Sequence, residues 1–242
     1  MTPVQDGYAV RFEWGVTGGA AIAADADCAL VVDILSFTTT VGVAVEHGTA
    51  VIPYPSLGEA AETVAAEHGA SLAGPRGLGL SLSPMSLREA DPAPARLVLP
   101  SPNGATVATA LAGTTTVAAA SVRNARAVAS WASGHGLTIA VVAAGERWPD
   151  GTLRPCIEDL WGAGAVLAAL EDLDLDLSPE AAAAADAYRV VAGRLGGHLA
   201  ACTSGAELVR QGFEADVSIA AESNTSGVVP VLGPDGFVAA TL

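Results

Sequence analysis

Short apolar runs alternate with alanine-rich segments along most of this 242-residue chain. Continuous apolar runs bounded by turn residues are typical of β-strands buried on both faces. We predict strands at Cys28–Ile34, Ala50–Tyr54, Arg96–Pro100, Thr116–Ala119 and Leu137–Ala144, and an edge strand in the alternating segment Tyr8–Trp14. Helices are predicted between them, at Thr39–His47, Leu57–His68, Ala105–Leu111, Ala125–Ser133 and Ile157–Leu170. This order predicts an α/β fold with three layers, α/β/α, around a mostly parallel or mixed central sheet.

The pattern changes after residue 172, in the acidic segment EDLDLDLSPE. Ser178-Pro179-Glu180 is a favourable helix start, because Pro fits the first helical position. We predict helices from there to about Gly212, and then strands at Asp216–Ala221 and Val228–Leu232. A single domain over residues 1–242 is expected, with 173–215 as a helical part that could form a second lobe.

The charge of the chain restricts what it can bind. There are 26 acidic and 11 basic residues, for a formal net charge of −15, and every basic residue is an arginine. The absence of lysine excludes the P-loop and Schiff-base chemistry. The negative charge argues against nucleic acid as a partner. An anionic ligand would have to be held by arginine, a metal ion or backbone N–H groups.

The cysteines and the apolar segments of the chain indicate the compartment in which the protein works. The three cysteines are far apart and include no CxxC pair, which favours a reducing compartment over a disulfide or zinc framework. The N-terminal segment lacks the pattern of a signal peptide, and the longest uncharged apolar stretch, Leu160–Leu170, is too short to span a membrane. We therefore expect a cytoplasmic protein that does not bind membranes.

Polar residues gather where four of the predicted strands pass into helices, in segments 33–40, 101–106, 121–125 and 145–159. Ligands of open α/β sheets bind at such carboxyl ends of strands. Asp33 ends a fully apolar run, where a carboxylate is costly unless a cation, a metal or several donors meet it. Taken singly, segment 33–40 is equally explained by helix capping, segments 101–106 and 121–125 are better explained by it, and the length of the 145–159 loop favours a functional role. Taken together, they indicate a pocket for an oxyanion.

The last of these segments is unusually long and carries Arg147 and Arg154 before Glu158-Asp159 open the next helix. The helix dipole alone favours acids in a first turn. Paired carboxylates near a sheet edge are also suited to Mg²⁺, which takes a few carboxylates together with water and substrate oxygens. Both interpretations stay open. If these acids bind Mg²⁺, the charge of the metal would reduce the repulsion between the acidic chain and a phosphorylated substrate.

The segments DILSFTTT (33–40), AGPRGLGLSLSPMSL (73–87), SPNGAT (101–106), SVRNA (121–125) and the 145–159 loop ending in IEDLWGAGA occur in an order that resembles the 2-phosphosulfolactate phosphatase family. Members typically read D-V-L-R-A-T-T-T, a Gly-rich loop with an arginine, T-T-N-G-T, S-F-x-N-A and a loop ending in E-D. The resemblance implies a three-layer α/β fold. It also implies Mg²⁺-dependent hydrolysis of 2-phospho-3-sulfolactate to sulfolactate and phosphate, a reaction of coenzyme M biosynthesis.

The resemblance also implies roles for particular residues. Asp33, Glu158 and Asp159 match the acidic positions assigned to the metal, and Asp33, Asp159 and Arg76 are the expected catalytic residues. Substrate binding is expected from Thr38, Thr39, Asn103, Gly104, Ser121, Asn124, Arg147 and Arg154. The partner is expected to be a small anionic phosphorylated metabolite, and a homodimer is compatible with the resemblance.

One departure from the family pattern bears on the substrate. The arginine of D-V-L-R-A-T-T-T is Ser36 in this chain, which removes a positive charge beside the expected phosphate site. Arg147 or Arg154 would be placed to compensate from the long loop. A shifted substrate, another lyase or hydrolase reaction at the same metal site, and non-catalytic binding of an anionic metabolite are therefore the alternatives to the family reaction.

Overall fold

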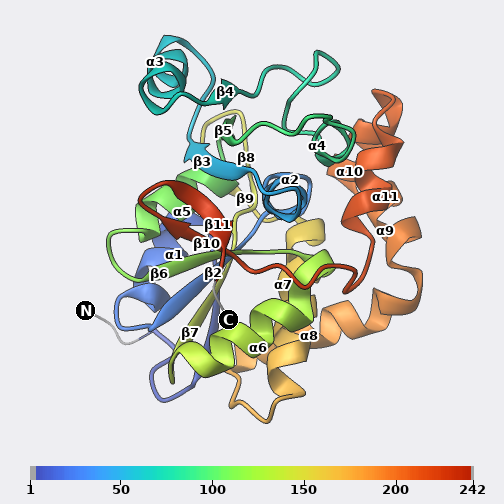
Figure 1. Cartoon of the computed structure of the whole chain (residues 1–242). Coiled ribbons are helices and arrows are strands. Elements are labelled where there is room, and N and C mark those ends of the chain that lie inside the picture. The colour runs from blue at the N-terminus through green and yellow to red at the C-terminus, as the bar shows by residue number, and fades with distance from the viewer. Residues whose placement is uncertain (1–3, 241–242) are drawn as a thin grey trace.

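The computed structural model describes residues 4–240 and shows one nine-stranded mixed sheet with helices on both faces (Figure 1). One half of the sheet is parallel, in the order β1 (Val10–Trp14), β7 (Ile139–Ala143), β2 (Cys28–Val32) and β6 (Thr116–Ala120). A second parallel set consists of β3 (Ala50–Tyr54), β5 (Arg96–Pro100) and the short β4 (Ser71–Leu72). The predicted α/β fold is confirmed.

A C-terminal hairpin joins the two parallel sets. Its strands, β10 (Pro230–Gly233) and β11 (Gly236–Ala239), pair with each other in antiparallel register. Val231 of β10 pairs with Ala118 of β6, and Phe237 of β11 pairs with Val51 of β3. Segments from the start, the middle and the end of the chain therefore share one sheet.

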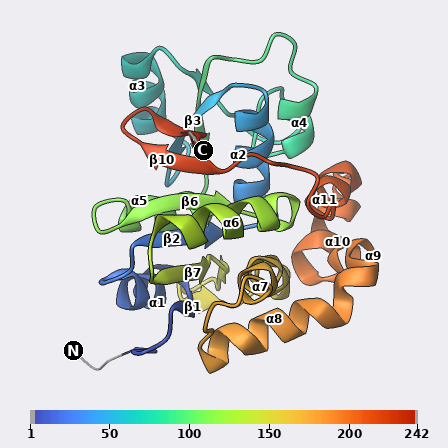
Figure 2. The ribbon, with the colours of Figure 1, turned by 60° about the horizontal axis from the view of Figure 1, so that its bottom comes forward.

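Helices cover both faces of the sheet, as the turned view shows (Figure 2). One face carries α6 (Ala125–His135) and α7 (Ile157–Glu171), with α8 (Pro179–Val191) packed on α7. The other face carries α1 (Gly15–Ala23), α2 (Phe37–Glu46) and α5 (Gly104–Leu111). The further helices are α3 (Glu59–His68), α4 (Pro84–Arg88), α9 (Leu195–Ala201), α10 (Thr203–Arg210) and α11 (Glu214–Ala220), with the 3-10 turns η1 (Val122–Asn124) and η2 (Ala192–Arg194).

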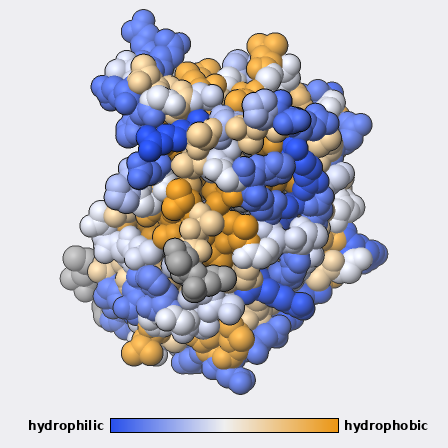
Figure 3. Space-filling view, viewed as in Figure 1, coloured by the Kyte–Doolittle hydropathy of each residue, from blue (hydrophilic) through white to orange (hydrophobic). Residues whose placement is uncertain are grey.

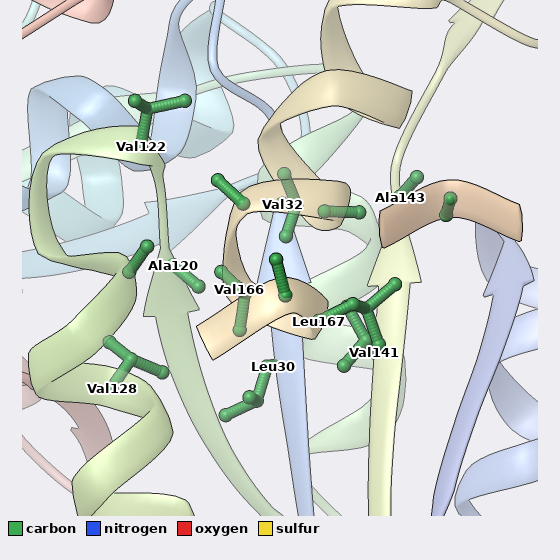
Figure 4. Close-up of a cluster of buried hydrophobic side chains, with 14 of the residues drawn as sticks. Leu30, Val32, Ala120, Val122, Val128, Val141, Ala143, Val166 and Leu167 are labelled. Carbon is green, nitrogen blue, oxygen red and sulfur yellow. The ribbon is translucent and has the colours of Figure 1, made fainter. Parts of the chain in front are cut away.

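The apolar strands explain the two-sided core. Side chains of successive strand residues point to opposite faces, so Leu30 and Val32 of β2 lie in one buried cluster and Ala29 and Val31 in the other. Figure 4 shows the first cluster, in which Leu30 and Val32 lie near Leu167 of α7. Both faces of β2 are therefore removed from water, and only its carboxyl end is left to carry polar chemistry.

The sequence predictions fail at several elements, and α4, β4 and β11 lie outside every predicted helix and strand. The segment Asp216–Ala221, expected as a strand, is helical and belongs to α11. Its Asp216 is buried against an arginine of a distant loop, and this tertiary contact outweighs the β-propensity of Val217 and Ile219. Helix α1 lies outside the predicted elements, because its glycines weaken the helical pattern. By contrast, Ser178 caps α8 as predicted, accepting a hydrogen bond from the backbone N–H of Ala181.

The face shown in Figure 3 is largely hydrophilic, with an apolar area in its middle, over the hairpin β10–β11. Val238 of this hairpin is 41% exposed. Within residues 4–240, no helix has the length and apolar character needed to cross a membrane. The homodimer stays a prediction.

Candidate functional site

Asp33 lies at the carboxyl end of β2, before the turn into α2. The buried side chain accepts hydrogen bonds from the backbone N–H groups of Phe37 (3.3 Å, to Oδ1) and Gly104 (2.8 Å, to Oδ2). Burial, together with the charges of Glu146 and Glu158, raises the pKa of Asp33 to about 7. Burial and the neighbouring acids therefore disfavour the ionised form of Asp33. A cation bound beside the carboxylate would stabilise that form.

A cavity of about 410 Å³ opens beside Asp33. Asp33 and Ser36 reach it from the turn after β2, residues 101–103 from the turn after β5, and α10 contributes Ser204 and Glu207. The loop after β7, which contains the small antiparallel pair β8 (Glu146–Arg147) and β9 (Leu153–Arg154), forms another wall. Three of the four predicted polar segments therefore meet at one cavity, and the segment 121–125 does not take part.

Three arginines line this cavity: Arg76, Arg147 and Arg154. The Nη2 group of Arg76 donates a hydrogen bond to Ser36 Oγ at 2.9 Å, and its Nη1 group pairs with Asp216. Arg76 thus supplies a positive charge beside position 36, which no residue of the β2–α2 turn supplies. A wall with several guanidinium groups suits a small ligand that carries more than one negative charge.

Arg154 and Arg147 belong to the hairpin β8–β9. The guanidinium of Arg154 lies 5.7 Å from the ring centroid of Trp148, a cation–π contact that holds it against the hairpin. Arg147 donates to the carbonyl oxygen of Gly151 at 3.3 Å. The long loop between β7 and α7 therefore brings two cationic side chains to the cavity, and their binding to substrate stays a prediction.

The turn after β5 contributes Asn103 and Gly104. Asn103 Nδ2 donates to Glu146 Oε2 at 2.8 Å and thereby orients an acid of the cavity wall. The backbone N–H of Gly104 donates to Asp33 Oδ2. The structure brings both residues to the site, where Asn103 lines the cavity and Gly104 supports Asp33.

Thr38 and Thr39 bond to the backbone of the turn that holds Asp33. Thr38 Oγ1 donates to the carbonyl oxygen of Asp33 at 2.9 Å and accepts from its N–H at 3.0 Å. Thr39 Oγ1 donates to the carbonyl oxygen of Ile34 at 2.9 Å. These hydroxyls stabilise the β2–α2 turn and do not line the cavity. Their binding to substrate stays a prediction.

Glu158 and Asp159 lie buried in the first turn of α7 and do not line the cavity. Asp159 accepts hydrogen bonds from the backbone N–H groups of Ile34 and Gly145, each at 2.9 Å, and so ties the end of β2 to the end of β7. Burial and then the charges of Asp33 and Glu158 raise the pKa of Asp159 well above its ordinary value. Asp159 therefore positions the loops of the site, and its metal and catalytic roles stay predictions.

Ser121 and Asn124 lie outside this group. Asn124 Oδ1 accepts from the backbone N–H of Ser121 at 2.8 Å, and Asn124 Nδ2 donates to the carbonyl oxygens of Ala119 and Val228. These bonds close the turn between β6 and α6 and link it to the segment before β10. The structure thus gives both residues contacts within the fold, away from the cavity.

Sequence reasoning missed Glu146 and the contribution of the C-terminal helices. Glu146 follows the buried strand β7 by three residues, which is the signal that identified Asp33 after β2. Ser204 and Glu207 of α10 and the ion pair of Asp216 had no such signal, because only the tertiary structure brings the segment 200–216 to this edge of the sheet.

Gly104 offers a test of the geometry around Asp33. A Cβ atom at this position would lie 2.6 Å from Asp33 Oδ2 and 2.5 Å from Phe37 Cδ1. We expect Gly104→Ala to displace the carboxylate, to lower kcat at least about tenfold, since misplacing a reacting group is costly, and to reduce the free energy of unfolding by about 1–3 kcal/mol. Urea denaturation and steady-state kinetics measure both.

Gly113→Ala is the matched control for this substitution, because a Cβ there has no neighbour within 4 Å. If the two variants had equal kcat and equal stability, the close approach of Gly104 to Asp33 would be refuted.

The chain is similar in sequence to proteins of a known family. The model of the 2-phosphosulpholactate phosphatase family matches residues 20–234. A protein of Deinococcus radiodurans, described as a "probable 2-phosphosulfolactate phosphatase", is 35% identical over 234 residues, which covers 88% of this chain and 91% of the relative. The family match includes the cavity segments, and the two matches confirm the resemblance drawn from the motifs. The chain therefore belongs to the 2-phosphosulfolactate phosphatase family, a family of phosphoric monoester hydrolases.

Proposed function

We propose that this protein is a Mg²⁺-dependent phosphatase that hydrolyses 2-phospho-3-sulfolactate to sulfolactate and inorganic phosphate. The family and the name of the Deinococcus relative support the reaction. The observation that carries the proposal is a single cavity lined by three arginines and the buried Asp33. The substrate bears a phosphate, a carboxylate and a sulfonate, and these anionic groups need several cationic partners in a confined space.

The acids of the cavity fit Mg²⁺ by their chemistry. Asp33 and Glu146 both line the cavity, and the charge of Glu146 contributes to the raised pKa of Asp33. Within residues 4–240, no three His, Cys, Asp or Glu side chains converge as a ligand set. Mg²⁺ does not require one, because it commonly binds through one or two carboxylates and completes its shell with water and substrate phosphate. Asp33 and Glu146, which reach the cavity, are therefore the proposed ligands, and the metal roles of Glu158 and Asp159 stay predictions.

The chain's own residues would bind and orient the substrate. Arg76, Arg147 and Arg154 would hold its anionic oxygens, and Asp33 would face the reacting phosphate from the end of β2. Asn103 would keep Glu146 in place through its hydrogen bond of 2.8 Å. When bound, Mg²⁺ would offset the charge of the phosphate and polarise its oxygens. Such fixed charges, aimed at a phosphoryl group, are the main source of catalysis in phosphoryl transfer.

The direct test is phosphate release from 2-phospho-3-sulfolactate by the purified protein, with Mg²⁺ and with EDTA. We expect turnover that EDTA abolishes and added Mg²⁺ restores. Phospholactate, which lacks the sulfonate, is the matched substrate and is expected to show a kcat/KM at least about tenfold lower, because it loses one charged contact. Calorimetric binding of 2-phospho-3-sulfolactate without phosphate release would instead identify a non-catalytic binder, and faster hydrolysis of phospholactate would identify a shifted substrate.

A further inference from the structure

Arg76 stands on a glycine-rich loop between β4 and α4, and it lines the cavity together with residues of the long loop 145–159. The side chain is 18% exposed. Nη2 donates to Ser36 Oγ, and within the described part of the chain the Nε–H group has no acceptor. Arg76 thus keeps donor groups available for an anion in the cavity.

Asp216, in the first turn of α11, holds the other side of this guanidinium. Its carboxylate is 1% exposed and pairs with Nη1 of Arg76. The same carboxylate accepts hydrogen bonds from Ser83 Oγ at 2.5 Å and from the backbone N–H of Met85 at 3.3 Å. A buried carboxylate with three donors is fixed in position, and it fixes Arg76 in turn.

Phe213 contacts the same guanidinium through its ring. The Cζ atom of Arg76 lies 5.7 Å from the ring centroid, within the range of a cation–π contact. Phe213 and Asp216 are three residues apart at the start of α11 and lie about 140 residues beyond Arg76 in the chain. One short segment of the C-terminal part therefore determines where the guanidinium stands.

Asp33 competes for this arginine. Asp33 and Arg76 line the same cavity, where burial lowers the pKa of Arg76 and the charges of Asp216 and Asp33 both act to raise it. A flexible arginine beside an uncompensated carboxylate would turn toward it and neutralise it. A stronger, buried partner keeps the guanidinium at the wall, so that Asp33 and Arg76 can act on a ligand separately.

We propose that Asp216 is the positioning residue of the anion site: it holds the guanidinium of Arg76 at the cavity wall beside Ser36, where this cation binds the phosphate of the substrate. This inference rests on the proposed function in assigning Arg76 to the phosphate. It explains how a chain with Ser36 in the β2–α2 turn keeps a positive charge at that point of the site.

The test is a double-mutant cycle with inorganic phosphate, the product, as the probe in calorimetry. Asp216→Asn is expected to weaken phosphate binding about 10–100-fold, and to raise the Michaelis constant for the phosphosulfolactate substrate by a similar factor with a smaller change in kcat. In the Arg76→Ala background, Asp216→Asn is expected to change phosphate affinity less than about twofold, because residues that act through one another are not additive. If Asp216 had a purely structural role, Asp216→Asn would weaken phosphate binding by the same factor in the wild type and in the Arg76→Ala variant.

Glu222→Gln is the matched control, since Glu222 also pairs arginines (Arg88 and Arg123) from the C-terminal part but does not line the cavity. It should leave phosphate affinity unchanged. If Asp216→Asn does not fold, Phe213→Leu keeps the carboxylate and should weaken phosphate binding about two- to fivefold through the lost ring contact. Unchanged affinity in Asp216→Asn or, failing that, in Phe213→Leu would overturn the proposal, and so would equal factors in both backgrounds.

The two proposals can fail separately. If the wild type bound phosphate, showed the non-additive cycle, and yet released no phosphate from 2-phospho-3-sulfolactate, the positioning role would stand and the proposed substrate would fall. If the protein hydrolysed that substrate but the double-mutant cycle were additive, the proposed function would stand and the positioning role of Asp216 would fall.

Discussion

Asp33→Asn is expected to lower kcat for phosphate release by about 10³-fold, because Asp33 is the buried carboxylate of the cavity and an amide cannot replace its charge. The substitution keeps the size of the side chain. One of the two backbone N–H groups, of Phe37 or Gly104, then faces an NH₂ group, at a cost of about 1–3 kcal/mol. The substitution also removes the repulsion between the Asp33 carboxylate and the charges of Glu146 and Glu158, and this gain in stability offsets the cost.

The experiment measures steady-state kinetics and thermal unfolding of the wild type and the variant side by side. Asp235→Asn serves as the control, since Asp235 is exposed in the turn between β10 and β11 and only pairs with Arg96 at 3.4 Å. We expect this control to keep full activity. Retention of more than about a tenth of the wild-type kcat in Asp33→Asn would remove Asp33 from the reaction, because loss of an essential group costs far more.

The metal-free protein is expected to lose stability as the pH rises through the titration of Asp33. Its pKa is raised from an ordinary 3.8 to about 7 in the folded state, so the folded state binds this proton more tightly than the unfolded state. The destabilisation is absent below about pH 4, grows between pH 4 and 7, and is complete above pH 7, where it amounts to roughly 4 kcal/mol. The raised pKa of Asp159 acts in the same direction.

Urea denaturation at pH 5, 6, 7 and 8 in EDTA measures this effect as a difference between the wild type and Asp33→Asn, which cancels the titration of acids remote from Asp33 and includes the change that the lost charge causes at Asp159. The stability gained by the variant should increase with pH up to about 7. Mg²⁺ should raise the melting temperature of the wild type more at pH 8 than at pH 5, because protons compete with the metal for carboxylates. A difference that does not change with pH would contradict the burial of an ionised Asp33.

Much of the site could be found from the sequence because it lies at strand ends. Asp33, Asn103, Arg147 and Arg154 follow strongly apolar strands, and the carboxyl ends of such strands are where α/β sheets place ligands. The same rule selected Ser121 and Asn124, which instead close their own turn. Capping and ligand binding use the same residue types, so only the direction of the side chain separates them.

Local hydrophobic patterns are sufficient to predict the alternating α/β order, the two-sided burial of β2 and the position of Asp33 at its end. The cation that stands beside Ser36 depends instead on long-range packing. Arg76, Phe213 and Asp216 come from loops and helices separated by about 140 residues, and they meet through one buried ion pair and one ring contact. Such long-range contacts leave no periodic trace in the chain, and in the segment Asp216–Ala221 they coincide with a helix where the local pattern predicts a strand.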